Sequence, residues 1–187
     1  LAGTDTTATA TCFALYELSR QPDLQETIAT EIILHGSKDS KDLREVPIVQ
    51  ALWKETLRLH PAAAMIDCEA NEPVTLCGQS FPTGTLFMLC TRVAYHGTPE
   101  VQAALGTDLD SFRPHRWLDS ENKIKSCSSL DNYAFGGGAR VCPGRNLANS
   151  VGPILLASIL TRFQIAPWEA AELGERQSFI LKPSAPV

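Results

Sequence analysis

The sequence predicts a mainly α-helical chain with a small antiparallel β part, an α+β fold, in one domain that spans residues 1–187. Apolar residues recur at helical spacing in the N-terminal third and again towards the C-terminal end. Between these segments lie β-prone runs separated by glycine and proline, which are typical of a small hairpin system. With 187 residues, 44% hydrophobic and 20% charged, the chain has an ordinary globular composition and can bury a core.

Three helices are predicted in the first third of the chain. The first covers residues 1–20, and the second begins at Pro22, a residue that suits the first turn of a helix. The polar run "GSKDSKDLRE" at 36–45 is expected to form an exposed loop. A third helix begins at Pro47, carries apolar residues at helical spacing and ends before Pro61.

The β part and a last helix are predicted further along the chain. Residues 73–89 contain two β-prone runs around Gly78 and a Pro-Thr-Gly turn, which indicates antiparallel hairpins. Residues 97–132 show no clear period and are expected to be irregular. A helix is predicted over 143–163, and "FILKP" at 179–183 is predicted to be a final strand.

Charge and hydropathy exclude some partners. The net charge of -5 gives no electrostatic basis for binding nucleic acid or an anionic membrane surface. Apolar runs such as residues 154–157 are far too short to span a bilayer, and no signal peptide is visible. The first residues open in the middle of a helical pattern, so we expect residue 1 to lie inside a helix whose first half is absent, together with any targeting or anchoring segment.

The six cysteines and four histidines form no C-x-x-C and no H-x-x-x-H pattern, which disfavours a zinc site. Four of the cysteines lie in apolar or strand-like sequence, as is typical of reduced core cysteines. The pattern therefore favours a reducing compartment and no disulfide framework.

The stretch "YAFGGGARVCPGRNLA", residues 133–148, places three consecutive glycines ahead of Cys142. These glycines break the G-x-G-x-x-G spacing of a phosphate loop and instead predict a flexible turn that brings backbone close to a flat or bulky group. We expect Pro143 at the first helical position, so a Cys142 thiolate would face free backbone N–H groups and the positive end of the helix dipole. A buried structural thiol at a tight turn explains the same pattern.

A second group consists of Glu55 and Arg58 in "WKETLRLHP", which share a helix face. On a surface such a pair is worth about 0.2–0.5 kcal/mol, and the residues alone favour this interpretation. The apolar neighbours leave open a buried structural pair that is expensive to break on one side.

A third group, Asp5 and Thr6, interrupts an otherwise apolar helix, where such residues are poor choices. Three explanations stay open. Asp5 could cap a helix, the threonine hydroxyl could bond back to the i−4 carbonyl and bend the axis, or the two could form a proton relay in a buried pocket.

Taken in order, four segments resemble one family, the cytochrome P450 haem-thiolate monooxygenases. "AGTDTT" (2–7) is similar to its oxygen-binding helix motif, and "ETLR" (55–58) to its E-x-x-R. "FRPHRW" (112–117) resembles F-x-P-x-R-W, and "FGGGARVCPG" (135–144) matches F-G-x-G-x-R-x-C-x-G at every specified position. The resemblance covers the whole chain but only the C-terminal part of the family's fold.

The resemblance implies that Cys142 is the thiolate ligand of a haem b iron, an arrangement in which the thiolate pushes electron density to favour O–O cleavage. Arg140 would lie near a haem propionate, where a guanidinium–carboxylate contact is favourable. Asp5 and Thr6 would deliver protons to dioxygen on the opposite face. The other cofactor-binding residues implied are Phe135, Gly136, Gly138 and Gly144.

The resemblance also implies a buried charge network under the haem, formed by Glu55, Arg58 and Arg116. The segment at 62–66 aligns with a stretch that lines the substrate pocket in this family, and its small or apolar residues favour a hydrophobic substrate. The pocket residues implied are Ala2, Ala62, Ala63, Ala64 and Met65.

The implied activity is insertion of one oxygen atom of O2 into an organic substrate, with the other released as water and electrons supplied by a separate reductase or ferredoxin. A haem-thiolate isomerase or dehydratase acting on peroxides, and an inactive truncated fragment, are the alternatives. For localisation, the family implies the endoplasmic reticulum or mitochondrial membrane in a eukaryote and the cytoplasm in a bacterium.

Three positions depart from the family pattern. Cys68 stands where many relatives carry an arginine that binds a propionate, and Gly97 replaces an arginine that often follows the histidine matched by His96. Pro153 lies inside the predicted last helix, where an interior proline costs on the order of 3 kcal/mol unless the helix bends.

Overall fold

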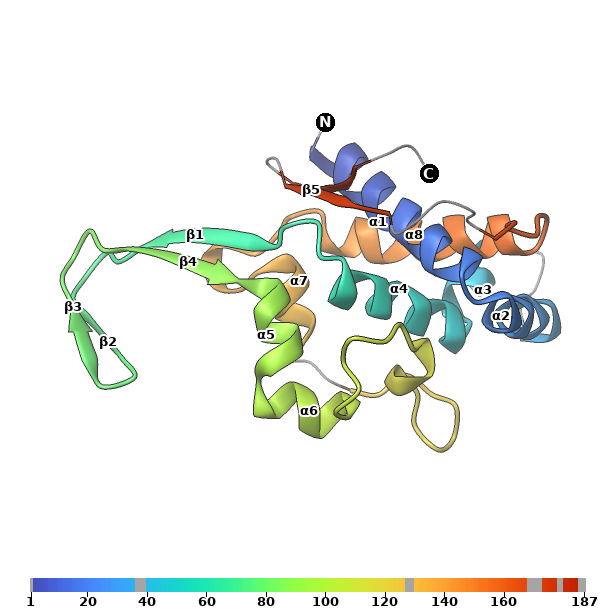
Figure 1. Cartoon of the computed structure of the whole chain (residues 1–187), viewed down its shortest axis with the longest axis horizontal. Helices are drawn as coiled ribbons and strands as arrows, with labels where there is room; N and C mark the ends of the chain where they lie inside the picture. Colours follow the sequence, from blue (N-terminus) through green and yellow to red (C-terminus); the bar gives the residue numbers. More distant parts are fainter. Residues whose placement is uncertain (1, 36–39, 127–129, 168–172, 178–179, 185–187) are drawn as a thin grey trace.

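A computed structural model describes residues 2–35, 40–126, 130–167, 173–177 and 180–184 (Figure 1). Helices dominate these residues, and their strands form three antiparallel pairs, β1–β4, β2–β3 and β5–β6. The predicted α+β class is confirmed. The elements in chain order are α1 (Ala2–Ser19), α2 (Pro22–His35), α3 (Ser40–Glu45), α4 (Pro47–Leu59), β1 (Met65–Glu69), β2 (Val74–Leu76), β3 (Gln79–Phe81), β4 (Leu86–Cys90), α5 (Thr91–Gly97), α6 (Pro99–Leu105), the 3-10 turn η1 (Pro114–Trp117), α7 (Asp131–Phe135), the 3-10 turn η2 (Gly138–Arg140), α8 (Arg145–Leu160), β5 (Glu175–Gln177) and β6 (Leu181–Pro183).

The core is built around α4, which contacts α1, α2, α3, α5 and α8 (Figure 1). Pro47 fills the first turn of this helix, where a missing backbone N–H leaves no bond unmade. Trp53 of α4 packs against α8 at Gly152, where a Cβ atom would come within 2.6 Å of the indole ring. Close packing of the two helices therefore requires glycine at this position. The fully buried apolar residues of α4 include Ile48, Val49, Ala51 and Leu52.

The helices predicted from periodicity are present, and the start of α8 needs one correction. This helix begins at Arg145 rather than at Pro143. Pro143 lies instead in a turn in which the Arg145 N–H donates to the Cys142 carbonyl at 3.2 Å, and Gly144 occupies the N-cap position. Further along, α8 continues through Pro153 without interruption.

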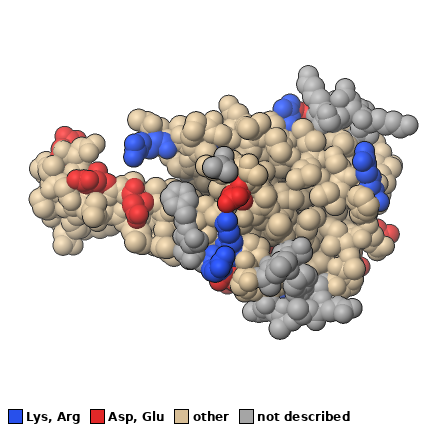
Figure 2. Space-filling model, turned by 90° about the horizontal axis from the view of Figure 1, so that it is seen from above, with Lys and Arg blue, Asp and Glu red and all other residues tan. Residues whose placement is uncertain are grey.

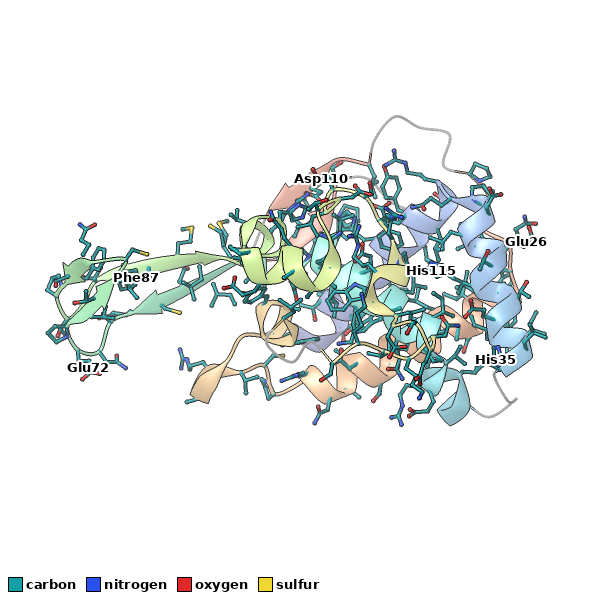
Figure 3. The ribbon with its side chains drawn as sticks, turned by 90° about the horizontal axis from the view of Figure 1, so that it is seen from below. Glu26, His35, Glu72, Phe87, Asp110 and His115 are labelled. Atoms are coloured by element: carbon teal, nitrogen blue, oxygen red, sulfur yellow. The ribbon has the colours of Figure 1, made fainter. Side chains whose placement is uncertain are left out.

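The β part forms an arm that projects away from the helices (Figure 1). Its base is the β1–β4 pair, with Met65 opposite Cys90, and its tip is the predicted hairpin β2–β3 around Gly78. Figure 3 shows Phe87 and Glu72 on this arm, far from the helical body. Strand β1 is not apparent in the sequence, because its five residues are exposed along most of their length and have no clean alternation.

Two regions expected to be irregular contain helices. Part of the expected loop at 36–45 is the short helix α3, whose Leu43 packs on the core. Residues 97–132, also expected to be irregular, contain α6, in which Val101 and Leu105 are buried one turn apart. These short elements are stabilised by tertiary packing more than by their own periodicity.

The C-terminal strands β5 and β6 form a hairpin, referred to here as the C-terminal hairpin, that lies over α1 (Figure 1). The predicted last strand is thus present as β6, although Phe179 lies outside the described residues.

The expectation that strand cysteines are core residues is wrong. Cys68, Cys77 and Cys90 are exposed, because the narrow β arm buries little surface, and all the described cysteines are free thiols.

Candidate functional site

One cavity of about 160 Å³ brings together three segments that are far apart in the sequence, and Trp53 and Leu57 of α4 also contribute to its lining. Thr6 and Ala10 face it from α1, and Ala62 and Ala63 face it from the turn that follows α4. The third side is formed by Phe135 and Cys142, from the residues between α7 and α8, with Ala148 at the start of α8. The cavity therefore has the thiol of Cys142 and the hydroxyl of Thr6 on walls that are otherwise mostly apolar.

Residues 135–144, the cysteine segment, fold back on themselves so that the Cys142 N–H donates to the Phe135 carbonyl at 2.9 Å. Gly136 and Gly138 have φ values of +72° and +61°, a region that side chains other than glycine rarely adopt. The Cys142 side chain is a free, exposed thiol that lines the cavity, so the alternative of a buried structural thiol is wrong.

The chemistry of this wall fits the haem that the resemblance implies. A single cysteine sulfur on an apolar wall is the donor used in thiolate-ligated haem sites. The adjacent backbone at Gly137 has open space where a Cβ atom would stand, so a flat group could approach it closely. Arg140 is exposed on the same segment, where its guanidinium is available to an acidic group of a ligand.

On α1, Thr6 lines the cavity and its hydroxyl donates to the Ala2 carbonyl four residues earlier at 2.9 Å. The bond from the hydroxyl to the i−4 carbonyl is one of the three arrangements that the sequence left open for the polar residues of α1. Asp5 does not cap the helix, because α1 already includes Ala2. Its exposed carboxylate instead accepts a hydrogen bond from Lys182 of β6 at 3.0 Å.

The other predicted pocket residues divide into two groups. Ala62 and Ala63 line the cavity with Thr6 and Cys142, whereas Ala64, Met65 and Ala2 do not line it. Ala64 is buried beside it, Met65 begins the exposed arm, and Ala2 is exposed at the start of α1. Ile66, the last residue of the segment at 62–66, lines the cavity as expected, whereas no pattern in the sequence indicated that Ala10 and Ala148 would do so.

Glu55 is the centre of a buried network, referred to here as the Glu55 network. Arg58 donates to both Glu55 oxygens, from Nε at 2.9 Å and from Nη2 at 3.0 Å, and neither side chain is exposed. Arg116 Nε donates to Glu55 Oε1 at 3.0 Å, and Trp117 Nε1 donates to Oε2 at 2.8 Å. The backbone N–H of Arg113 adds a fifth hydrogen bond to Glu55, at 2.9 Å. The pair is therefore no surface feature.

The arginines of this network use their remaining donors on backbone carbonyls. Arg58 Nη1 donates to Leu109 at 2.7 Å, and Arg116 Nη1 donates to Leu105 at 2.8 Å. Charges without water are tolerated only when they are paired and hydrogen-bonded in this way. The network joins α4 to the residues that precede and form η1, so it stabilises the fold.

The surface of the described residues is mixed in character. Figure 2 shows basic and acidic side chains scattered over the face in view, without a broad area of one sign among the residues described there. Within the described ranges, no helix has both the length and the hydropathy that a membrane crossing would need.

Comparison with known proteins identifies the family. A model of the cytochrome P450 family matches residues 1–186. The chain is 31% identical to the mitochondrial cholesterol side-chain cleavage enzyme of Oncorhynchus mykiss, over 99% of the chain and 35% of that enzyme. It is 32% identical to the mitochondrial 1,25-dihydroxyvitamin D(3) 24-hydroxylase of Mus musculus, over 98% of the chain and 35% of that enzyme. Identity to the mitochondrial sterol 26-hydroxylase of Homo sapiens is 30%, over 100% of the chain and 36% of that enzyme.

The chain thus spans about a third of the length of these relatives. Its helices and small antiparallel sheets correspond to a portion of the P450 fold. The family consists of oxidoreductases that bind haem b, and the match over residues 1–186 decides the assignment. The chain belongs to the cytochrome P450 family.

Proposed function

We propose that the protein containing this chain is a haem-thiolate monooxygenase that inserts one oxygen atom of O2 into a hydrophobic organic substrate. The observation that carries the proposal is the cavity that has Cys142 on one side and Thr6 on another. A thiolate donor and a hydroxyl on opposite segments are what oxygen activation with controlled proton delivery requires.

Cys142 is the proposed ligand of the haem iron. Haem bound by this thiolate supplies the reductive activation of dioxygen, because the sulfur donates electron density to the iron. The cysteine segment holds the sulfur in place through the Cys142 N–H···Phe135 hydrogen bond, and the glycines before it admit the flat ligand. Arg140 is the proposed partner of a propionate.

Thr6 and Asp5 are the proposed route for protons. The Thr6 hydroxyl lies on the cavity wall, and the adjacent Asp5 carboxylate is exposed to solvent. In the proposed route, a proton taken up at the Asp5 carboxylate passes to Thr6 Oγ1, whose hydroxyl must first turn away from the Ala2 carbonyl to which it donates. Lys182 holds the carboxylate at the surface end of this route.

The proposed substrate is of the sterol class. Ala10, Ala62, Ala63 and Ile66 give the cavity small and apolar walls, which suit a hydrophobic molecule. The names of the relatives state sterol and vitamin D substrates, and all three relatives are mitochondrial. We accordingly propose a mitochondrial protein that receives electrons from a ferredoxin or a separate reductase.

The carbon monoxide complex of the reduced full-length protein tests the proposal. We expect the red-shifted Soret band of thiolate-ligated haem, and we expect Cys142→Ala to abolish it while the exposed control Cys90→Ser retains it. A Cys142→Ala protein that kept the band would refute the assignment of the ligand. Turnover of a hydroperoxide without any electron donor, and no turnover with one, would favour the isomerase or dehydratase chemistry instead.

A further inference from the structure

A second cluster of charged side chains lies where α4 ends, outside the cavity and the Glu55 network. His60 directly follows α4 and is only 7% exposed. Its ring stacks on Phe13 of α1, with centroids 4.3 Å apart and planes 1° from parallel. The imidazole is therefore held in a fixed plane, and its two nitrogens point at fixed partners.

Both ring nitrogens of His60 contact carboxylates. Nε2 lies 2.8 Å from Glu17 Oε1 on α1, and Nδ1 lies 3.0 Å from Glu175 Oε1 on β5. A neutral imidazole has a single N–H, so two ionised carboxylates on both nitrogens require the imidazolium form. Arg92 of α5 pairs with the second oxygen of Glu175. With His60 protonated, the cluster would pair two positive groups with two carboxylates, and pairing of this kind is what makes buried charges tolerable.

This cluster joins two of the segments that form the cavity, α1 and the turn after α4, to the C-terminal hairpin. α1 carries Thr6, and the chain after His60 leads directly to Ala62 on the cavity wall. The C-terminal hairpin, held through Glu175, makes its own contacts with the same wall, because the Leu181 N–H donates to the Ala62 carbonyl at 2.9 Å. The bond between Lys182 and Asp5 attaches the same hairpin to α1.

We propose that His60, as an imidazolium between Glu17 and Glu175, is a positioning residue that fixes the C-terminal hairpin against α1 and the cavity wall. The protonation of one side chain then controls how firmly the hairpin is held. The contacts of His60 do not involve haem, so they do not depend on the proposed function. Only the effect of a firmly held cavity wall on catalysis rests on that function.

The direction of the pH dependence follows from the partners of His60. Burial lowers the pKa of His60, but the hydrogen bonds and charges of Glu17 and Glu175 outweigh burial and raise the pKa above its ordinary value. Arg92, the other cation of the cluster, bonds to Glu175 rather than to the ring. The stabilisation by His60 is therefore complete below about pH 6.5, the ordinary value for histidine, and is lost as the pH rises through the raised pKa.

Glu175 sets the acid limit. The hydrogen bond from His60, followed by that from Arg92, lowers the pKa of Glu175 below its ordinary value although burial opposes this. Its stabilisation is present above the ordinary glutamate pKa and is lost as the pH falls through the lowered one. The hairpin is held most firmly between these two limits.

Hydrogen exchange of the full-length protein tests the proposal. The readout is the protection factor of the Leu181 N–H, whose bond to Ala62 reports contact between hairpin and wall. In the unmodified protein we expect protection to fall by about tenfold or more as the pH rises through the His60 pKa. In Glu17→Gln, the fall should occur at lower pH, because one of the carboxylates that raise the pKa is gone. The control His35→Gln, an exposed residue at the end of α2 (Figure 3), should change neither.

His60→Gln should give low protection at every pH, and if this variant does not fold, Glu17→Gln decides. Protection that does not depend on pH in the unmodified protein, or an unshifted fall in Glu17→Gln, would overturn the inference. The Soret band of the carbon monoxide complex is measured on the same samples. A protein with the predicted pH dependence but no thiolate band would refute the function and leave the role of His60 standing. A protein with the thiolate band but without the predicted pH dependence would refute the role of His60 and leave the function standing.

Discussion

The Glu55 network and the cysteine segment both place arginine near an acidic group, the Glu55 carboxylate in one and the Cys142 thiol in the other. They differ in how far these side chains are buried and bonded within the chain. In the network, Glu55 accepts five hydrogen bonds and neither it nor Arg58 is exposed. In the cysteine segment the backbone is bonded internally, but the side chains of Arg140 and Cys142 are exposed. The first region has its partners within the chain, whereas the second presents its functional groups outward.

This difference predicts that stability and ligand binding can be separated by mutation. A buried charge that loses its partner is left without water or compensation, so changes in the network should act on folding. Changes in exposed side chains away from such features usually alter stability by less than about 0.5 kcal/mol. Changes to the exposed side chains of Arg140 and Cys142 should therefore act on the bound haem and leave the fold intact.

The largest effect is expected for Glu55→Gln. The substitution leaves Arg58 and Arg116 charged beside a neutral amide in a buried site, so the free energy of unfolding should fall by about 3–5 kcal/mol. Urea unfolding of the full-length protein measures this. Glu45→Gln, which breaks an exposed pair with Arg44, is the matched control and should cost no more than about 1 kcal/mol. Equal losses in the two variants would show that burial does not distinguish the pairs.

Cys142→Ser should produce the opposite pattern. The haem-free protein should unfold within about 0.5 kcal/mol of the unmodified one, because the thiol is exposed. The absorption spectrum of the haem-loaded variant should nevertheless lack the thiolate band completely. A large loss of stability in the haem-free variant would mean that the sulfur is structural, and the contrast between the two regions would fail.

Gly152→Ala tests whether a change between the two regions affects both the stability of the fold and the binding of haem. Gly152 of α8, the helix that follows the cysteine segment, packs against Trp53 of α4, the helix that carries Glu55. An added methyl must displace the indole ring or α8, at about 1–3 kcal/mol of unfolding free energy, and should also weaken haem binding. Gly97→Ala, where a Cβ atom meets no other atom within 4 Å, is the control and should change neither measurement.

Much of the helical fold could be predicted from the sequence, because α1, α2, α4 and α8 are long enough to show an apolar period or a proline at their start. The short elements could not. α3, α6 and β1 are each seven residues or fewer, and they depend on packing partners elsewhere in the chain, such as the contact of Leu43 with the core. A local pattern carries no information about such partners.

In the candidate site, too, residues in contiguous motifs could be predicted and their distant partners could not. Cys142 and Thr6 could be identified because their motifs are contiguous, and the structure then places both on one cavity. The partners of these motifs could not be identified. Lys182 is 177 residues from Asp5, and Glu175 is 115 residues from His60, so no spacing in the sequence connects them. Trp117 is the last residue of the motif at 112–117, but only the fold shows that its indole N–H bonds to Glu55.

The smallest change in stability is expected for Arg140→Ala. This variant compares an exposed arginine of the cysteine segment with Arg116, a buried arginine of the Glu55 network. Arg116 is 7% exposed and bonds to Glu55 and to backbone carbonyls, so its loss should destabilise the fold. The exposed Arg140 should be dispensable for folding, within about 0.5 kcal/mol. Because we propose that Arg140 makes a charge-assisted bond to a propionate, haem should transfer from the variant to an acceptor protein about five- to tenfold faster, as expected for about 1 kcal/mol. The exposed control Arg162→Ala should change neither quantity, and an unchanged transfer rate in Arg140→Ala would remove this arginine from the haem site.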